Sequence, residues 1–298
     1  MAVVAFVVFS LLYFTPGDPA AVLAGDAATS DDIAKIREKL GLDQPFFTRF
    51  GAWTWALAHG DLGTSIFTNL PVTQLIGQRI EPTLSLTLCT LLLSVGIAVP
   101  LGVLAAARAG SWVDRLVMAF SVLGFSVPVF VLAYGLILTF SIQLDWLPVQ
   151  GYRNLKDGLW DWLRHLILPS IALGTVYIAL IARITRASML DVLAQDYIRT
   201  AQAKGLAPAG VVLGHALKNA AVPIMTIVGI GIALLIGGAI VTETVFAIPG
   251  VGRLTVDAIL RRDYPIIQGV ILMFSGAYVI INLAVDLSYM LLDPRIRY

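Results

Sequence analysis

The chain has 298 residues, of which 58% are apolar and 13% charged, and its mean hydropathy is +0.86. This composition excludes an ordinary soluble domain and indicates a protein that crosses a membrane several times. The formal net charge of +1 does not identify partners, because charge on a membrane protein acts loop by loop. The single cysteine, Cys89, excludes an internal disulfide bond.

The chain begins with "MAVVAFVVFSLLYF", an apolar stretch over residues 1–14. This stretch is shorter than the roughly 20 residues that a spanning helix needs, and it lacks the basic start of a signal peptide. We interpret it as the end of a first transmembrane helix whose beginning is missing from this chain.

Residues 15–80 are predicted to form a helical segment outside the cytoplasm. Within it, "SDDIAKIREKLGL" has the pattern of an amphipathic helix, in which Ser30 can cap the start, the isoleucines and leucine have helical spacing, and Gly41 can end the helix. We expect a small folded element that packs on the transmembrane helices. A dedicated ligand site is the less favoured alternative.

Five further windows are long and apolar enough to cross a bilayer, which predicts six transmembrane helices with both termini on the same side. Prolines and glycines inside these windows are expected to be tolerated, because neighbouring helices satisfy the freed backbone groups. The rule that short cytoplasmic loops are rich in Lys and Arg places residues 108–112, 189–220 and the tail 293–298 in the cytoplasm. The windows cover residues 82–107, 113–142, 166–188, 221–245 and 266–292.

The stretch "DYIRTAQAKGLAPAG", residues 196–210, is a polar interruption between two apolar windows. Residues 187–204 are predicted to form one amphipathic helix, which Gly205 can end in the left-handed cap conformation. Pro208 then suits the first turn of a second helix. The predicted apolar stripe of the first helix consists of Leu190, Leu193, Ala194, Tyr197 and Ala201.

The side chains at this predicted turn are small, so that the backbone of another protein could approach closely. Arg199 and Lys204 place positive charges at its rim. The residues alone leave two interpretations open: a docking surface for a partner, or a helical hairpin that lies on the membrane surface or packs on its own helix bundle.

No motif in the chain indicates catalysis or metal binding. The sequence contains neither a phosphate-binding G-x-x-x-x-G-K-[ST] loop nor a zinc-binding H-E-x-x-H pair, so we expect no catalytic residue, no metal site and no cofactor in this chain. Two acidic residues near or inside the apolar windows, Glu243 and Asp286, are interpreted as paired or snorkelling at a membrane interface. A proton relay, as in a secondary transporter, is the alternative.

Several stretches along the chain together resemble one family. The loop "YIRTAQAKGLA" is similar to the "YIRTARAKGLS" of permeases for dipeptides, oligopeptides and nickel, the DppB/OppB-like branch of ABC importer permeases, with Ala207 in place of the usual serine. The general permease pattern E-A-A-x-x-x-G is matched only at Ala201 and Gly205. The other matching stretches are "FTPGDPA" (14–20), "FSVPVF" (125–130), "WLPVQGY" (146–152), "ETVFAIPGVGRL" (243–254), "RDYPIIQG" (262–269) and "DPRIRY" (293–298).

This resemblance implies an all-α integral membrane protein with the type I ABC importer permease fold. The protein would have six transmembrane helices. Residues 81–292 would form the permease core, and within it residues 189–220 would form a cytoplasmic coupling helix–turn–helix. The chain would not be an enzyme, because two partner ATPase subunits would bind ATP and Mg²⁺. A homologous second permease, an extracytoplasmic binding protein and membrane lipid would be its other partners, in the bacterial inner membrane, with no role for nucleic acid.

The resemblance also implies two sites and a substrate class. The substrates would be peptides, with nickel chelates, glutathione and sugars as alternatives. An extracytoplasmic loop would reach toward the binding protein, although its glycines equally suit a plain re-entrant turn. That loop contains Phe246, Pro249, Gly250, Gly252 and Arg253, and the residues implied to couple the chain to an ATPase are Tyr197, Arg199, Thr200, Ala201, Ala203, Lys204, Gly205, Leu206 and Pro208.

Overall fold

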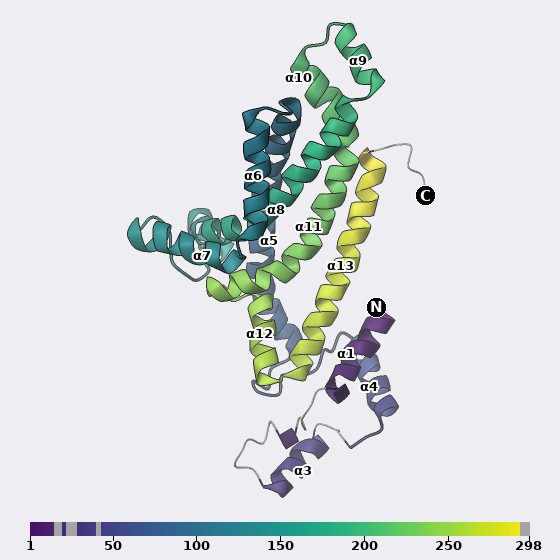
Figure 1. The fold of residues 1–298 in the computed structure, drawn as a ribbon. Coiled ribbons are helices and arrows are strands. Elements are labelled where there is room, and N and C mark those ends of the chain that lie inside the picture. The colour runs from purple at the N-terminus through teal and green to yellow at the C-terminus, as the bar shows by residue number, and fades with distance from the viewer. Residues whose placement is uncertain (15–19, 22–28, 40–42, 293–298) are drawn as a thin grey trace. The chain divides into compact units, whose positions relative to one another are not determined.

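The computed structural model describes residues 1–14, 20–21, 29–39 and 43–292, and most of these residues are helical (Figure 1). Among them, the only β pairing is an isolated bridge between Thr64 and Pro71. The prediction of an all-α fold is confirmed. Helices suit a bilayer because each satisfies its own backbone hydrogen bonds.

The chain forms two compact units, each built from two separate segments. One unit comprises Met1–Arg79 and Leu254–Ala277, and the other comprises Ile80–Arg253 and the residues from Tyr278 onward. The helices α5 (Val72–Ala107), α12 (Val251–Arg261) and α13 (Tyr264–Leu292) each contribute to both units.

The first unit contains three shorter helices, α1 (Ala2–Phe14), α3 (Ser30–Lys39) and α4 (Phe46–Ala58). α3 confirms the predicted amphipathic helix, but Thr29 rather than Ser30 precedes it, and the Thr29 carbonyl accepts the first helical hydrogen bond. The predicted end of this helix at Gly41 and the predicted tail at 293–298 lie outside the described residues.

Four helical stretches of the described chain are long and apolar enough to cross a membrane. They lie at four of the predicted windows, whereas α1, with 13 residues, is too short to be counted as a span. The stretches are α5, α8 (Leu159–Leu193), a run Pro208–Leu235 that includes most of α11 (Leu217–Val245), and α13 up to Tyr289.

The predicted window at 113–142 is not one straight helix. It contains α6 (Trp112–Ser126), α7 (Val129–Leu136) and a π-helical segment, with a bend of 101° between the two halves (Figure 1). Pro128 causes the break, because the residue before a proline is pushed out of the helical region: Val127 has φ −91° and ψ 120°. The expectation that this proline would be tolerated within the span was therefore wrong.

The hydrophobic core of the second unit is built around α8, which packs against α6, α7 and α11. Fully buried side chains such as Leu166, Leu173 and Ile181 line its inner face. This packing fixes the positions of α8 and α11. The polar segments that carry the candidate site follow the ends of these two helices in the chain.

Candidate functional site

The polar stretch after α8 forms a separate short helix, α9 (Asp196–Ala203). α8 stops at Leu193, and Gln195 has an extended backbone with φ −75° and ψ 149°. The prediction of one continuous helix over residues 187–204 is therefore wrong. No glycine or proline marks this break in the sequence.

The break changes which side chains of α9 face the protein. The predicted stripe turned Tyr197 inward, but Tyr197 is 44% exposed, whereas its neighbour Ile198 is fully buried. Ala201, one turn later, is also buried, and both residues join the hydrophobic core of the unit. A narrow apolar stripe thus anchors α9, and its remaining faces are open.

Gly205 ends α9 as predicted, in the left-handed conformation with φ 79°. Its N–H donates to the Gln202 carbonyl (2.9 Å), and the N–H of Leu206 donates to the Ala201 carbonyl (3.4 Å). These two bonds form a Schellman motif, which favours glycine where φ is positive. A Cβ added at Gly205 would meet no atom within 4 Å, so this position faces open space.

Pro208 begins the returning arm, as predicted. It is the first residue of α10 (Pro208–Gly210), and Ala207 before it is extended, with φ −60° and ψ 141°. A π-helical segment, Val211–Ala216, then joins α10 to α11. Both ends of this segment are buried in the same core as α9, so apolar contacts hold both arms.

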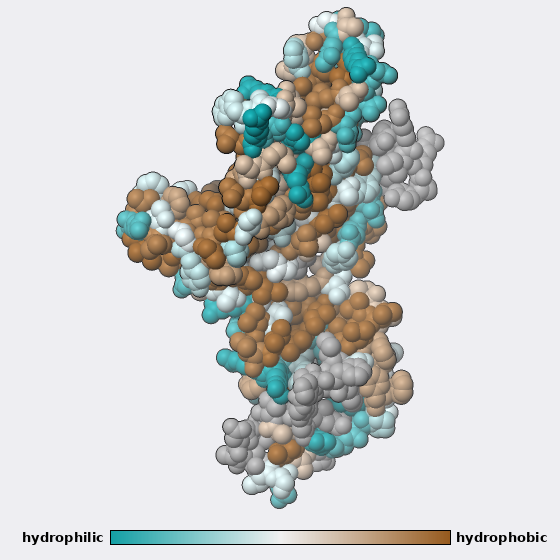
Figure 2. Space-filling model, viewed as in Figure 1, coloured by the Kyte–Doolittle hydropathy of each residue, from teal (hydrophilic) through white to brown (hydrophobic). Residues whose placement is uncertain are grey.

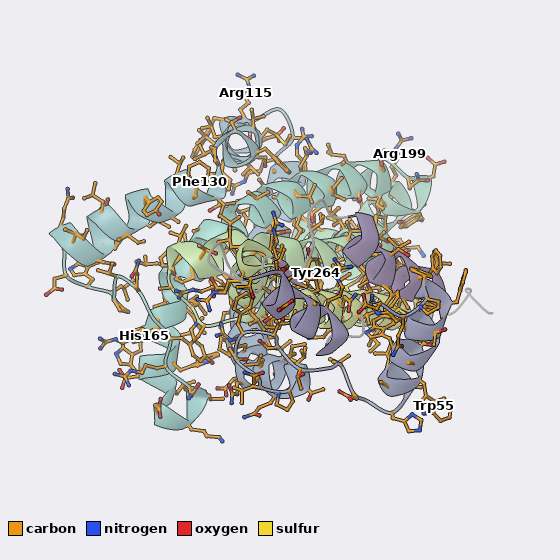
Figure 3. The ribbon with its side chains drawn as sticks, turned by 90° about the horizontal axis from the view of Figure 1, so that it is seen from below. Trp55, Arg115, Phe130, His165, Arg199 and Tyr264 are labelled. Atoms are coloured by element: carbon orange, nitrogen blue, oxygen red, sulfur yellow. The ribbon has the colours of Figure 1, made fainter. Side chains whose placement is uncertain are left out.

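The segment from α9 to α10, called here the α9–α10 tip, lies beyond the ends of α8 and α11 (Figure 1) and mixes hydrophilic with hydrophobic residues on its surface (Figure 2). Arg199 points outward from it (Figure 3) and lies 3.3 Å from the exposed carboxylate of Asp196. Of the predicted coupling residues, Ala201 alone is buried. The exposed ones are Tyr197, Arg199, Thr200, Ala203, Lys204, Gly205, Leu206 and Pro208.

An ion pair that the sequence analysis missed braces the helices below this tip. Arg186 of α8 binds Asp114 of α6 with two hydrogen bonds, one from Nε to Oδ1 and one from Nη2 to Oδ2 (2.7 Å). The Asp114 side chain is only 5% exposed and that of Arg186 is 24% exposed. A two-point contact of this kind fixes orientation as well as distance, so α6 is held to the last turns of α8.

Asp114 also organises the turn between α5 and α6. Its Oδ2 accepts a hydrogen bond from the Gly110 N–H (2.9 Å), while Ser111 caps α6 by accepting one from the Asp114 N–H (3.4 Å). The spacing S-x-x-D at Ser111–Asp114 is a helix-start signal that sequence could have revealed. The partner Arg186, 72 positions later, could not have been found in this way.

A second set of contacts surrounds Glu243, in the last turn of α11. Its carboxylate is completely buried and accepts hydrogen bonds from the Thr83 hydroxyl (2.7 Å) and from the Arg253 N–H (2.9 Å). Arg253 is the third residue of α12, so Glu243 caps the positive end of that helix. The Val251 N–H donates to Thr83 (2.8 Å), which ties α5 to the same junction.

Gly250 and Gly252 make room for this carboxylate. A Cβ on Gly250 would collide with the Glu243 carboxyl group, and one on Gly252 would lie 2.8 Å from the Cα of Ile240. Both glycines are therefore required by close packing. Sequence analysis noticed the glycines and the acid separately but had no means of pairing them.

The loop between α11 and α12, called here the α11–α12 loop (246–250), is also fixed from its other side. The Gly151 N–H donates to the Phe246 carbonyl (2.8 Å), and the Gln150 amide donates to the Val245 carbonyl (3.2 Å). The stretches "WLPVQGY" and "ETVFAIPGVGRL" are thus brought together. Of the predicted loop residues, Phe246, Gly250 and Gly252 are buried, Pro249 is exposed and Arg253 is partly exposed.

Tyr152 extends this contact region to α5. Its hydroxyl lies 3.0 Å from the Ser85 hydroxyl and donates to the Glu81 carboxylate at 3.3 Å. The phenol is the donor in this contact, and burial raises the pKa of Tyr152 above its ordinary value. Asp286, the other acid that sequence analysis singled out, is exposed on α13.

Together these features define a polytopic α-helical membrane protein with a projecting polar tip, and among the described residues no group of three or more potential metal ligands occurs. Residues 98–298 match the family described as the binding-protein-dependent transport system inner membrane component, and residues 1–87 match the N-terminal family of the same systems. The chain belongs to this family of transport permeases.

Curated relatives agree with this assignment over the full chain. A probable peptide ABC transporter permease of Sinorhizobium fredii (strain NBRC 101917 / NGR234) is 56% identical over 100% of this chain and 95% of its own length. A dipeptide transport permease of Alkalihalophilus pseudofirmus is 42% identical over 98% and 94%. A glutathione transport permease of Salmonella paratyphi A is 43% identical over 100% and 95%.

Solved structures agree on the fold. An inward-facing structure of the MetNI methionine ABC transporter matches with a TM-score of 0.62 and 19% identity, over 74% of this chain and 97% of that one. At this identity the match concerns the fold alone. The predicted type I ABC importer permease fold is confirmed.

Proposed function

We propose that this chain is the permease subunit of an ABC importer of the bacterial inner membrane and that its cargo is peptides. The full-length relatives whose names specify peptides, dipeptides and glutathione support this substrate class, since glutathione is itself a small peptide. Transport of labelled dipeptides, oligopeptides and glutathione into vesicles containing the complete importer tests the choice, and uptake of none of them would contradict it.

The α9–α10 tip is the docking element for an ATPase subunit in this proposal. The observation that carries the assignment is the division of the tip into a buried anchor, Ile198 and Ala201, and an exposed surface on which the small residues Ala203 and Gly205 lie among larger side chains. A partner backbone can approach small side chains closely, while the anchor transmits its displacement to the core.

Two connections would carry that displacement into the membrane. α10, the π-helical segment and α11 follow one another without a gap, and α8 lies on the other side of α9 across a break of two residues. A push on the tip would then move α8 and α11 largely as rigid bodies, as in other domain-driven switches.

The remaining parts of the importer are partner chains. Two ATPase subunits would hold ATP and Mg²⁺, a homologous permease would complete the translocation path, and both termini of this chain would face the cytoplasm. The α11–α12 loop would then face the extracytoplasmic binding protein, with Pro249 as its exposed contact point. Because the loop accepts a hydrogen bond from Gly151 at Phe246 and donates one from Ile248 to the Glu243 carbonyl, we propose that it is a rigid platform and not a flexible flap.

Gly205→Trp tests the docking assignment. A Cβ at Gly205 would meet no atom of this chain within 4 Å, so the added bulk points into open space where a partner would dock, and the backbone strain of a side chain at φ 79° is controlled for separately. We expect the complex to lose peptide-stimulated ATP hydrolysis and uptake, while the permease still inserts in the membrane. Hydrolysis and uptake at the level of the unmodified complex would show that the tip is not the docking element.

Two control variants separate bulk from backbone strain. Gly205→Ala introduces the strain of a side chain at φ 79° without the bulk, and we expect it to retain coupling. Gly110→Trp places the same bulk at a second open glycine with the same φ of 79°, in the turn between α5 and α6. Uptake should survive Gly110→Trp if the effect at Gly205 comes from the docking site.

A further inference from the structure

The helix α4 packs against α1 through a cluster of aromatic rings. Phe9 of α1 contacts Phe46 and Phe50 of α4, each with ring centroids 5.4 Å apart, in edge-to-face geometry. Phe6 contacts the same two rings at 5.9 and 5.6 Å. Such pairs are favourable beyond the area that they bury, so α4 is held along one side of α1.

The opposite side of α4 is also apolar, and it is open. Phe47 and Trp55, two turns apart, are 78% and 71% exposed, and Trp55 points outward from the helix (Figure 3). Gly51 lies between them on the same stripe, which contains no charged residue. The hydroxyl of Thr54 donates to the Phe50 carbonyl (2.9 Å), so the helix satisfies this polar group internally.

A helix that is apolar on both sides is expected in a protein core or a membrane rather than in water. With 13 residues, α4 is about 20 Å long, which is too short to cross a hydrocarbon layer of about 30 Å. Polar residues flank it, with Asp43 before and Asp61 after the helix. A helix too short to span, with polar residues at both ends and an exposed tryptophan, fits the boundary between lipid and water, where tryptophan is enriched.

α1, whose residues are almost all apolar, also exposes apolar side chains. α1 exposes Val3 (77%) and Val7 (52%), and Phe6 is 46% exposed although it contacts α4. Exposed apolar side chains on both helices thus flank the same aromatic cluster. In a chain of a membrane transport family, lipid is the expected surroundings of the exposed apolar side chains on α1, and lipid would equally account for the exposure of Phe47 and Trp55.

We propose that α4 is an interfacial helix that binds the lipid bilayer through Phe47 and Trp55. Aromatic side chains are favoured at this depth because they combine an apolar body with, in tryptophan, a polar N–H group. Arg49 supports the placement: its guanidinium lies 5.8 Å from the centre of the Phe9 ring, on the α1 side and off the lipid-facing stripe. α4 thereby anchors α1 at the membrane surface through the aromatic contacts of Phe9.

Site-directed spin labelling of the assembled importer tests the proposal. A nitroxide is attached at Phe47→Cys or at Trp55→Cys in a Cys89→Ala background, in nanodiscs of phosphatidylcholine and phosphatidylglycerol. Collision with oxygen, which concentrates in lipid, is compared with collision with a water-soluble nickel chelate. Gln44→Cys, at an exposed polar position just before the helix, provides the matched control.

Lipid insertion predicts an oxygen-to-nickel accessibility ratio several-fold higher at positions 47 and 55 than at position 44. A ratio equal to that at position 44 would place the helix in water and overturn the proposal. Low accessibility to both reagents would also overturn it, because a protein partner would then cover the stripe. Uptake by the labelled complexes confirms that each variant is folded, and agreement between two independent positions guards against a local effect of either label.

Discussion

The α9–α10 tip and the α11–α12 loop differ in how they are held. The tip is anchored by a narrow apolar stripe and leaves eight of its nine predicted coupling residues exposed. Among the predicted loop residues only Pro249 is exposed; the backbone of the loop is hydrogen-bonded, and the buried Glu243 carboxylate caps α12 directly after it. The tip therefore leaves most of its surface exposed, whereas the polar groups of the loop are engaged in the structure of the chain itself.

This difference shows that small residues in two stretches typical of the family can have two different structural roles. At the tip, a Cβ added at Gly205 would have nothing within 4 Å. Gly250 of the α11–α12 loop and Gly252 of α12 have no such open space, because Glu243 lies beside both. Substitutions in the loop should act mainly on folding, and substitutions in the tip should act mainly on coupling.

The largest effect is expected for Glu243→Ala. It removes the buried carboxylate that accepts hydrogen bonds from the Thr83 hydroxyl and the Arg253 N–H, and removing one partner of a buried hydrogen bond costs about 1–3 kcal/mol. We expect a lower Tm of the purified complex and less permease in the membrane. Asp286→Ala removes an exposed carboxylate and should change neither; equal Tm values for the two variants would contradict the buried cap.

The second largest effect is expected for Asp114→Ala. It leaves Arg186 without its partner, but the loss should be smaller than the about 3–5 kcal/mol typical of a fully buried pair, because Arg186 is partly exposed. We expect a lower Tm, together with uptake reduced more than ATP hydrolysis if α8 and α6 must move together. The exposed pair Asp161–Arg164 is the control, and Asp161→Ala should have no measurable effect on Tm.

Gly252→Ala is expected to cost about 1–3 kcal/mol by overpacking, because the added Cβ meets the backbone of Ile240, which cannot turn away as a side chain can. A thermal unfolding scan measures the shift. Gly237→Ala adds a methyl group on α11 where nothing lies within 4 Å and should leave the Tm unchanged or slightly raised. If Gly252→Ala and Gly237→Ala had the same Tm, close packing would not explain why position 252 is a glycine.

Arg199→Ala should have the smallest effect on folding. Its ion pair with Asp196 is exposed, and exposed pairs contribute little to stability. We therefore expect an unchanged Tm but weaker peptide-stimulated ATP hydrolysis, most clearly at low salt, where surface charges act over longer distances. A fall in Tm comparable to that of Asp114→Ala would show that Arg199 acts on folding stability instead.

The spans and the two ends of the tip could be predicted from the sequence because they depend on local chemistry. An apolar window of sufficient length forms a helix in lipid whatever its neighbours are, and Gly205 and Pro208 mark a helix end and a helix start by their own backbone preferences. Pro128 is an equally local signal, and it predicts the bend between α6 and α7. The expectation that this proline would be tolerated within a continuous span was therefore wrong.

Only the tertiary structure decided the pairings across the chain and the orientation of α9. Arg186 lies 72 positions from Asp114, and Glu243 lies 160 positions from Thr83, so no spacing rule links them. The break before α9 has no glycine or proline, and the burial of Ile198 rather than Tyr197 shows that packing against the core sets its phase. The sequence by itself determined which segments are helical and apolar, because those properties belong to each segment alone. Which side chains meet, and which stay open for a partner, depends on how the helices pack.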